Sequence, residues 1–225
     1  MCKIYYNGGA NEVKKMELYD NLVNTFGYDE PFFSSEITKK IKLRTSTLNV
    51  YLKRLYENKF IEKYQRGVYY IPNKTKGSKL SSKKVYEKKY INNQGDTFGY
   101  YVGLYFKNLL GLSAQVPNVI EIMTNEEKSR LRKVIIGNQK LRLRKSRCNI
   151  NSKNYKILQL LELITSLDAK ELTDSNVKKI LKYMLEAKIT INLISQYLKY
   201  FPDKTSRKLI ESGIIYELAS KQKTI

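Results

Sequence analysis

Residues 32–72 constrain the fold more than any other stretch of the chain, because their apolar spacing changes from a helical period to a β-like one within a short segment. Ser34 or Ser35 can cap a first helix that ends at Ile41, since a Ser side chain accepts a hydrogen bond from an orphan backbone N–H. Ile37 and Ile41 then lie on one face, which predicts a short helix packed on a core.

A second helix is predicted after a turn at residues 42–44, capped by Thr45 or Ser46 and ending at Asn58. Its apolar side chains recur at the spacing of one helix face: Leu48, Leu52 and Leu55. The opposite face is short, polar or cationic, which suits base edges and phosphates in a DNA major groove. The predicted DNA contacts of this segment are Arg44, Ser46, Thr47, Asn49, Val50, Lys53 and Arg54.

The segment that follows predicts a β-hairpin. β-prone residues occupy positions 60–64 and 68–71, a turn containing Gly67 separates them, and Pro72 ends the second strand. A helix–turn–helix followed directly by a hairpin is the plan of a winged helix. Arg66 would then lie at the tip of the wing, where it could contact a phosphate or the minor groove.

A further helix at residues 12–26, ended by Gly27, would complete this domain, with Phe32 and Phe33 seating the following loop on the core. Two interpretations of the domain stay open. The helical pair and the wing bind DNA, or they belong to an ordinary three-helix domain whose basic face is only solvated.

Charge favours a polyanionic partner. The chain of 225 residues has 42 Lys and Arg against 21 Asp and Glu, a net charge of +21. The excess is greatest in residues 76–147, which hold 16 Lys and Arg but five Asp and Glu. This segment is therefore either a second nucleic-acid surface or part of a generally cationic protein, and an acidic protein partner is an alternative to DNA.

The composition argues against several classes of site. Without any His, the chain has no His-based acid–base catalysis and no His-ligated metal. Cys2 and Cys148 are too isolated in sequence to predict a zinc site or a disulfide framework. We expect no cofactor and no bound metal. No apolar run approaches the length of a membrane span, so the sequence predicts a soluble cytoplasmic protein that does not bind membranes.

The sequence predicts an α+β fold with two domains: a winged helix-turn-helix at residues 1–75 and a basic α+β domain at 76–225 that ends in helices. In the second domain, residues 73–84 predict a linker or a basic arm. A short helix is expected at 101–110 and a buried strand at 119–123. Helical spacing recurs at 155–167, from Thr173 or Asp174 onward, at 190–200 and from Asp203 or Thr205 to Ile210.

A second hairpin is predicted around Gly137 and Asn138. On its second strand Leu141 and Leu143 would face inward, whereas Arg142 and Arg144 would face outward. The two arginines give a basic strand edge. They are either a further DNA contact or charges that keep an edge strand from pairing with another chain.

Enzymatic activity is not expected. Asp96 and Glu121 are the candidate metal-binding carboxylates of a nuclease, but Glu121 is followed by Ile122 and Met123, so the Glu-x-Lys spacing of such sites is missing. A metal-dependent nuclease remains the third hypothesis, after a DNA-binding regulator and a protein-interaction module.

The middle of the chain also carries a recognisable pattern, Gly-Tyr-x-x-Gly followed by Leu-Gly-Leu-x-x-Gln-x-Pro. Its residues here are Gly99, Tyr100, Gly103, Gly111, Leu112, Gln115 and Pro117, ending in Thr124 and Asn125. With the winged helix before it and the basic hairpin after it, the chain resembles the AbiEi-type antitoxins of type IV toxin–antitoxin systems over about residues 12–165.

The resemblance implies a cytoplasmic transcriptional autorepressor that binds double-stranded DNA at its own promoter. It further implies an antitoxin that counteracts a nucleotidyltransferase-like toxin, encoded by the neighbouring gene, without requiring a stable complex. Related proteins also occur as solitary DNA-binding regulators, and that alternative stays open.

Overall fold

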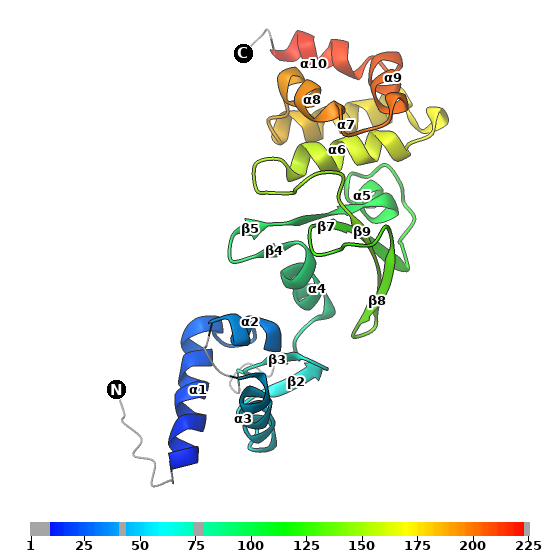
Figure 1. Ribbon diagram of the computed structural model, residues 1–225. Coiled ribbons are helices and arrows are strands. Elements are labelled where there is room, and N and C mark those ends of the chain that lie inside the picture. Colours follow the sequence, from blue (N-terminus) through cyan, green and yellow to red (C-terminus); the bar gives the residue numbers. More distant parts are fainter. Residues whose placement is uncertain (1–9, 41–43, 74–78, 223–225) are drawn as a thin grey trace. The chain divides into compact units, whose positions relative to one another are not determined.

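The computed structural model describes residues 10–40, 44–73 and 79–222. The fold is α+β, with ten α-helices and three small sheets in the described part of the chain (Figure 1). The chain divides into two compact units, Met1–Val85 (unit 1) and Tyr86–Ile225 (unit 2). The division falls inside one helix, α4 (Ser82–Tyr90).

Unit 1 combines three helices with a three-stranded antiparallel sheet. Its elements are α1 (Ala10–Phe26), β1 (Phe32–Phe33), α2 (Ser34–Lys40), α3 (Thr45–Glu57), β2 (Glu62–Gln65) and β3 (Val68–Tyr70). Gly27 ends α1 with φ +75°, as the sequence predicts, because glycine adopts this left-handed conformation without a Cβ clash.

The predicted hairpin of unit 1 is confirmed, but the sheet is larger than expected. β3 lies between β2 and β1, and Gly67 supplies the turn of the hairpin with φ +74°. Phe32 and Phe33 were expected in a loop; instead they form β1, paired with Tyr69 and Val68. Both phenylalanines are buried, and their backbone satisfies the free side of β3.

The predicted helix caps in unit 1 are wrong. α2 already includes Ser34 and Ser35, and at its start the Glu36 carboxylate accepts a hydrogen bond from the Phe33 N–H at 3.0 Å. Thr45 is likewise the first residue of α3, so the extended capping position falls on Arg44, whose side chain makes no capping bond. The expected end of the first helix at Ile41, and Lys42 and Leu43 of the expected turn, lie outside the described residues.

The apolar stripe predicted for the second helix is confirmed. Leu48, Leu52 and Leu55 of α3 are each fully buried. They join a core built from α1, α2, α3 and the ends of the sheet, whose other members include Leu22, Phe26, Phe32, Ile37, Ile61 and Ile71. Burial of this stripe fixes which face of α3 is left for solvent.

Unit 2 begins within α4 and contains a small hairpin, a four-stranded sheet and a group of helices. After α4 come β4 (Asn92–Asn93), β5 (Asp96–Thr97), β6 (Gly99–Val102), α5 (Gly103–Leu109), β7 (Val119–Thr124), β8 (Arg132–Ile136) and β9 (Gln139–Lys145). Of the predicted linker, residues 74–78 lie outside the described residues, Leu80 is buried and the segment from Ser82 is helical.

The four-stranded sheet has the order β6-β7-β9-β8, with β7 parallel to β9 and the other pairs antiparallel. The buried strand predicted at 119–123 is confirmed as β7. The helix predicted at 101–110 starts later: Tyr101 and Val102 belong to β6, and α5 begins at Gly103, whose φ is +63°. Pairing with β7 decides the strand, and glycine permits the sharp change of direction.

The chain ends in a helical group, as predicted: α6 (Tyr155–Ser166), α7 (Asp174–Glu186), α8 (Ile191–Leu198), α9 (Asp203–Glu211) and α10 (Ile214–Gln222). Thr173 caps α7, its hydroxyl accepting from the Asn176 N–H. The last helix, α10, was not predicted. These helices and α5 share one core with Tyr100, Val102 and Met123 of the sheet. In the described part of the chain, no helix is both long and apolar enough to cross a membrane.

Candidate nucleic-acid interface

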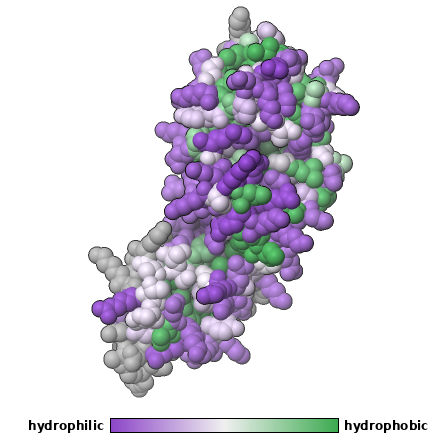
Figure 2. Space-filling model, turned by 45° about the vertical axis from the view of Figure 1, so that its right-hand side comes forward, coloured by the Kyte–Doolittle hydropathy of each residue, from purple (hydrophilic) through white to green (hydrophobic). Residues whose placement is uncertain are grey.

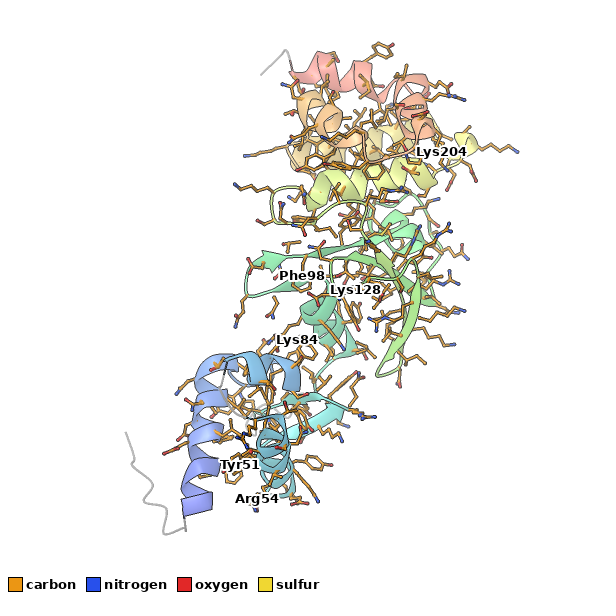
Figure 3. The ribbon with its side chains drawn as sticks, viewed as in Figure 1. Tyr51, Arg54, Lys84, Phe98, Lys128 and Lys204 are labelled. Atoms are coloured by element: carbon orange, nitrogen blue, oxygen red, sulfur yellow. The ribbon has the colours of Figure 1, made fainter. Side chains whose placement is uncertain are left out.

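The outer face of α3 holds most of the predicted DNA contacts. Arg44, Ser46, Asn49, Val50, Lys53 and Arg54 are exposed and Thr47 is half-buried. The buried stripe and this face lie on opposite sides of the same helix because successive side chains rotate by about 100°. Tyr51, between the two faces, is buried, whereas Arg54 one turn later is exposed (Figure 3).

One aliphatic side chain lies among the polar ones. Val50 is 48% exposed and lies between the exposed amide Asn49 and the buried aromatic Tyr51. A single exposed aliphatic residue needs no explanation in itself. Placed between an amide and two cations on one helix face, it offers a methyl surface next to hydrogen-bonding groups, which is the combination that distinguishes thymine from other bases in a major groove.

The two cations of this face differ in their partners. Lys53 Nζ lies 3.8 Å from Glu57 Oε1, with both side chains more than half exposed, so this pair is weak and open to exchange with another anion. Arg54 pairs with no carboxylate of the described residues; its carbonyl accepts from Asn58 Nδ2 at 2.8 Å, which helps to end the helix. Arg54 therefore keeps all its guanidinium donors available.

Arg66 lies at the turn of the β2–β3 hairpin and is exposed. The turn is tied to α2, because the Ser34 N–H donates to the Gly67 carbonyl at 3.1 Å. A Cβ on Gly67 would lie 3.3 Å from Ser34 Oγ, so the glycine also permits this close approach. The hairpin is thus held at the helix that immediately precedes α3.

The structure adds a basic residue that the sequence analysis missed. Lys63 is exposed on β2, close in sequence to Arg66, and its Cα is paired with that of Tyr69. Its position in the first strand of the predicted hairpin, three residues before Arg66, could have indicated it. On the other side of the hairpin, burial and a hydrogen bond to the Glu62 carboxylate raise the pKa of Tyr70, so this hydroxyl stays protonated as a donor to Glu62.

Arg142 and Arg144 lie in unit 2, on β9. The inward and outward arrangement predicted for this strand is confirmed: Leu141 and Leu143 are buried, Arg142 is exposed and Arg144 is half-buried. The predicted strand edge is wrong, because β9 lies between β7 and β8. Both arginines share one carboxylate, with Glu121 oxygens 3.3 Å from Arg142 Nη1 and 4.0 Å from Arg144 Nη1.

The two carboxylates considered for a nuclease, Asp96 and Glu121, have different surroundings. Glu121 is engaged by the two arginines, whereas Asp96 is exposed on the small β4–β5 hairpin. Among the described residues there is no group of three or more His, Cys, Asp and Glu side chains placed to hold a metal ion.

The glycine pattern in the middle of the chain has a structural role. A Cβ on Gly99 would lie 1.9 Å from the Tyr90 carbonyl oxygen, so only glycine fits where β6 passes the end of α4. Gly103 and Gly111 bound α5 with φ +63° and +67°. These positions shape the backbone and place no polar group for chemistry. No protein-family model matches the chain, and no curated protein is significantly similar to it.

Proposed function

We propose that unit 1 is a winged helix-turn-helix that binds double-stranded DNA, with α2 and α3 as the helical pair and the β2–β3 hairpin as the wing. The observation that carries this proposal is the division of α3 into a fully buried leucine stripe and an exposed face of Ser46, Asn49, Val50, Lys53 and Arg54. DNA binding is supported over a merely solvated face by the combination of an amide, an aliphatic side chain and two cations on this one face.

The exposed groups match the chemistry of a major groove. An Asn amide such as that of Asn49 can bond an adenine edge with two hydrogen bonds, and the methyls of Val50 can contact a thymine methyl. Arg54 can bond a guanine or a phosphate, while Ser46 and Thr47 lie in the first turn of the helix, where backbone N–H groups also favour a phosphate. Arg66 of the wing and Arg44 before the helix would add phosphate contacts.

The proposal extends from DNA binding to a regulatory role. We propose that the DNA is the promoter of the protein's own gene, so that the protein is a cytoplasmic autorepressor. Its net charge of +21 supports strong electrostatic attraction to DNA of any sequence, while the α3 side chains would supply the preference for one site. The antitoxin role rests on the resemblance to AbiEi-type proteins, and a solitary regulator is the alternative.

The test is a mobility-shift titration with the upstream region of the gene and with scrambled duplex of equal length, over a salt series. The double variant Lys53→Ala/Arg54→Ala should lose preference for the upstream DNA. Its slope of log affinity against log salt should fall by about 0.9 for each phosphate contact removed. A folded chain is verified by its circular dichroism.

A matched control is available in α7. Lys182 is 78% exposed and lies 3.9 Å from Glu186, a pair much like that of Lys53 and Glu57, and Lys178 is also exposed. Lys178→Ala/Lys182→Ala removes the same charge without touching α3 and should keep the preference for upstream DNA. If both double variants change binding equally, the protein binds through overall charge and the α3 face has no special role.

The antitoxin role requires a separate experiment. The nucleotidyltransferase-like product of the neighbouring gene is expressed under an inducible promoter with and without this protein. Restored growth in the presence of the native chain supports the antitoxin role, whereas unrelieved arrest leaves the solitary DNA-binding regulator.

A further inference from the structure

In the described part of the chain, the β8 edge of the four-stranded sheet of unit 2 is open. β6 and β8 are its outer strands, and β8 lies on the outside of the sheet in Figure 1. The β6 side meets the chain after α4, where the Phe98 and Gly99 N–H groups donate to the Ile91 carbonyl at 2.8 and 3.1 Å. β8 pairs with β9 on one side, and no other strand of the described residues pairs with it.

The hairpin register shows which backbone groups of β8 point outward. Two residues, Gly137 and Asn138, connect Ile136 to Gln139, so Ile136 and Gln139 form the hydrogen-bonded pair that closes the turn. Hydrogen-bonded and non-hydrogen-bonded pairs alternate along an antiparallel ladder. Lys133 and Ile135 are therefore the residues whose N–H and C=O groups face away from β9, and neither residue makes another hydrogen bond within the described part of the chain.

The side chains along this edge are exposed and of two kinds. Ile135 is 63% exposed, and Leu131 before the strand is 50% exposed, whereas Lys133 is an exposed cation. Figure 2 shows green apolar patches between the purple hydrophilic side chains that cover most of the visible surface. An exposed β-branched residue beside unpaired backbone groups is the usual template for addition of a strand.

Charge decides what kind of strand can be added. Lys133 lies directly opposite Arg142, and Ile135 lies opposite Lys140, so these side chains occupy one face. Arg142 and Arg144 share Glu121, and no carboxylate of the described residues pairs with Lys133 or Lys140. Like charges facing each other across strands are destabilising, and an acidic side chain placed beside Lys133 would relieve that repulsion.

We propose that β8 is a docking edge for an extended acidic segment of a partner protein. The segment adds to the sheet as a further strand, with an acidic side chain beside Lys133 and an apolar one beside Ile135 two residues away. This mode is β-augmentation, in which main-chain hydrogen bonds give affinity and alternate side chains give specificity. A second copy of the chain is disfavoured as occupant because its β8 carries the same cations.

A peptide is favoured over nucleic acid by the backbone groups themselves. The outward N–H and C=O groups of Lys133 and Ile135 alternate at the spacing of another peptide strand, and a phosphate backbone can satisfy the N–H groups but not the carbonyls. The proposal does not depend on the DNA-binding role of α3, because all its residues lie in unit 2.

The probe is a capped, fluorescent peptide containing Glu-Thr-Val-Thr-Glu, which is a palindrome and so presents the same side chains in either strand direction. Binding to the full chain is measured by anisotropy. Two further peptides are N-methylated, one at the Glu and Val amides and the other at the Thr amides. In an antiparallel ladder the Glu and Val amides of the peptide face β8, whereas in a parallel ladder the Thr amides do. One methylated peptide should therefore bind at least tenfold more weakly than the parent peptide, and the other should bind like the parent. Equal binding of all three peptides would overturn the proposal.

The protein variants give an independent test. Ile135→Pro removes an N–H that points outward and no ladder bond to β9, as proline is accepted at such edge positions. It should weaken peptide binding at least tenfold, while Ile135→Thr, which keeps the N–H and a β-branched side chain, should stay within about threefold of the native chain. Lys133→Glu should also weaken peptide binding, and all three variants should keep the preference for upstream DNA over scrambled DNA.

Amide hydrogen exchange reports the same contact directly. The Lys133 and Ile135 amides should exchange rapidly in the free chain and become protected when the peptide binds. Unchanged exchange at both amides would refute strand addition. Displacement of the peptide by duplex DNA from the Ile135→Pro variant as well as from the native chain would also refute it, because the surface would then be only a cationic patch.

Discussion

The strongest stability prediction concerns the ion pair between Arg147 and Glu162. Arg147 follows β9, and its Nε lies 2.5 Å from Oε1 of Glu162 on α6. The Glu162 side chain is 7% exposed, whereas that of Arg147 is 31% exposed and lies over the Phe201 ring at 5.1 Å from its centroid. Arg147 therefore connects the chain after β9 to α6 and to the segment between α8 and α9.

The two single truncations should differ because the partners are buried to different depths. Arg147→Ala leaves an uncompensated carboxylate in the core and should lower the free energy of unfolding by about 3–5 kcal/mol. Glu162→Leu leaves a guanidinium that water still reaches and that keeps its contact with Phe201, so the loss should be only about 1 kcal/mol. The difference follows from exposure, since the Coulomb attraction lost is the same in both.

The single variant Arg147→Met, which leaves the same carboxylate unpaired as Arg147→Ala, and the double variant Arg147→Met/Glu162→Leu complete the cycle. Replacement of a buried ion pair by apolar side chains of similar volume is often neutral, so we expect a stability within about 1 kcal/mol of the native chain. If the double variant is neutral, single losses of about 3–5 and about 1 kcal/mol give a coupling energy of roughly 4–6 kcal/mol between the two positions.

Amide exchange in α6 under native conditions is the appropriate assay, because it reports unit 2 alone in a chain of two units. The chain also has no Trp that could report unfolding by fluorescence. Equal losses for the two single variants, or a loss below 1 kcal/mol for Arg147→Ala, would refute the argument from exposure.

Three further predictions concern other side chains. Leu52→Ala should destabilise unit 1 by about 2–5 kcal/mol because Leu52 is fully buried, whereas Val50→Ala on the exposed face of α3 should change stability by less than about 0.5 kcal/mol, both measured by amide exchange in α3. Tyr100→Phe should leave unit 2 equally stable or more stable by up to about 1 kcal/mol, because the Tyr100 hydroxyl is buried without a hydrogen-bond partner in the described part of the chain. A loss of stability above about 1 kcal/mol would show that the hydroxyl does make a hydrogen bond. Lys107 Nζ donates to both Glu171 oxygens at 2.8 and 2.9 Å and thereby lowers the pKa of that carboxyl from its usual 4.5. The resulting stability is present above pH 4.5 and should be lost as the pH falls through the lowered pKa; Lys107→Met should reduce this dependence in acid titrations followed by circular dichroism.

The sequence by itself determined the local elements of this protein. The leucine stripe of α3, the hairpin turns at Gly67 and Gly137, and the inward and outward sides of β9 all follow from residue spacing and from glycine backbone freedom, and the structure confirms them. The exposed face of α3 was likewise visible in the sequence, because burial of one helix face leaves the other in solvent.

Only the tertiary structure decided which strands pair. Phe32 and Phe33 form a strand because β3 offers them a free edge, and Tyr101 and Val102 are β rather than helical because β7 lies beside them. β9 is an inner strand because it pairs in parallel with β7, which places Glu121 between Arg142 and Arg144 and moves the open edge to β8. The local spacing of residues indicates that a segment can form a strand. Which strand it pairs with is set by hydrogen bonds and side-chain burial between residues far apart in the chain.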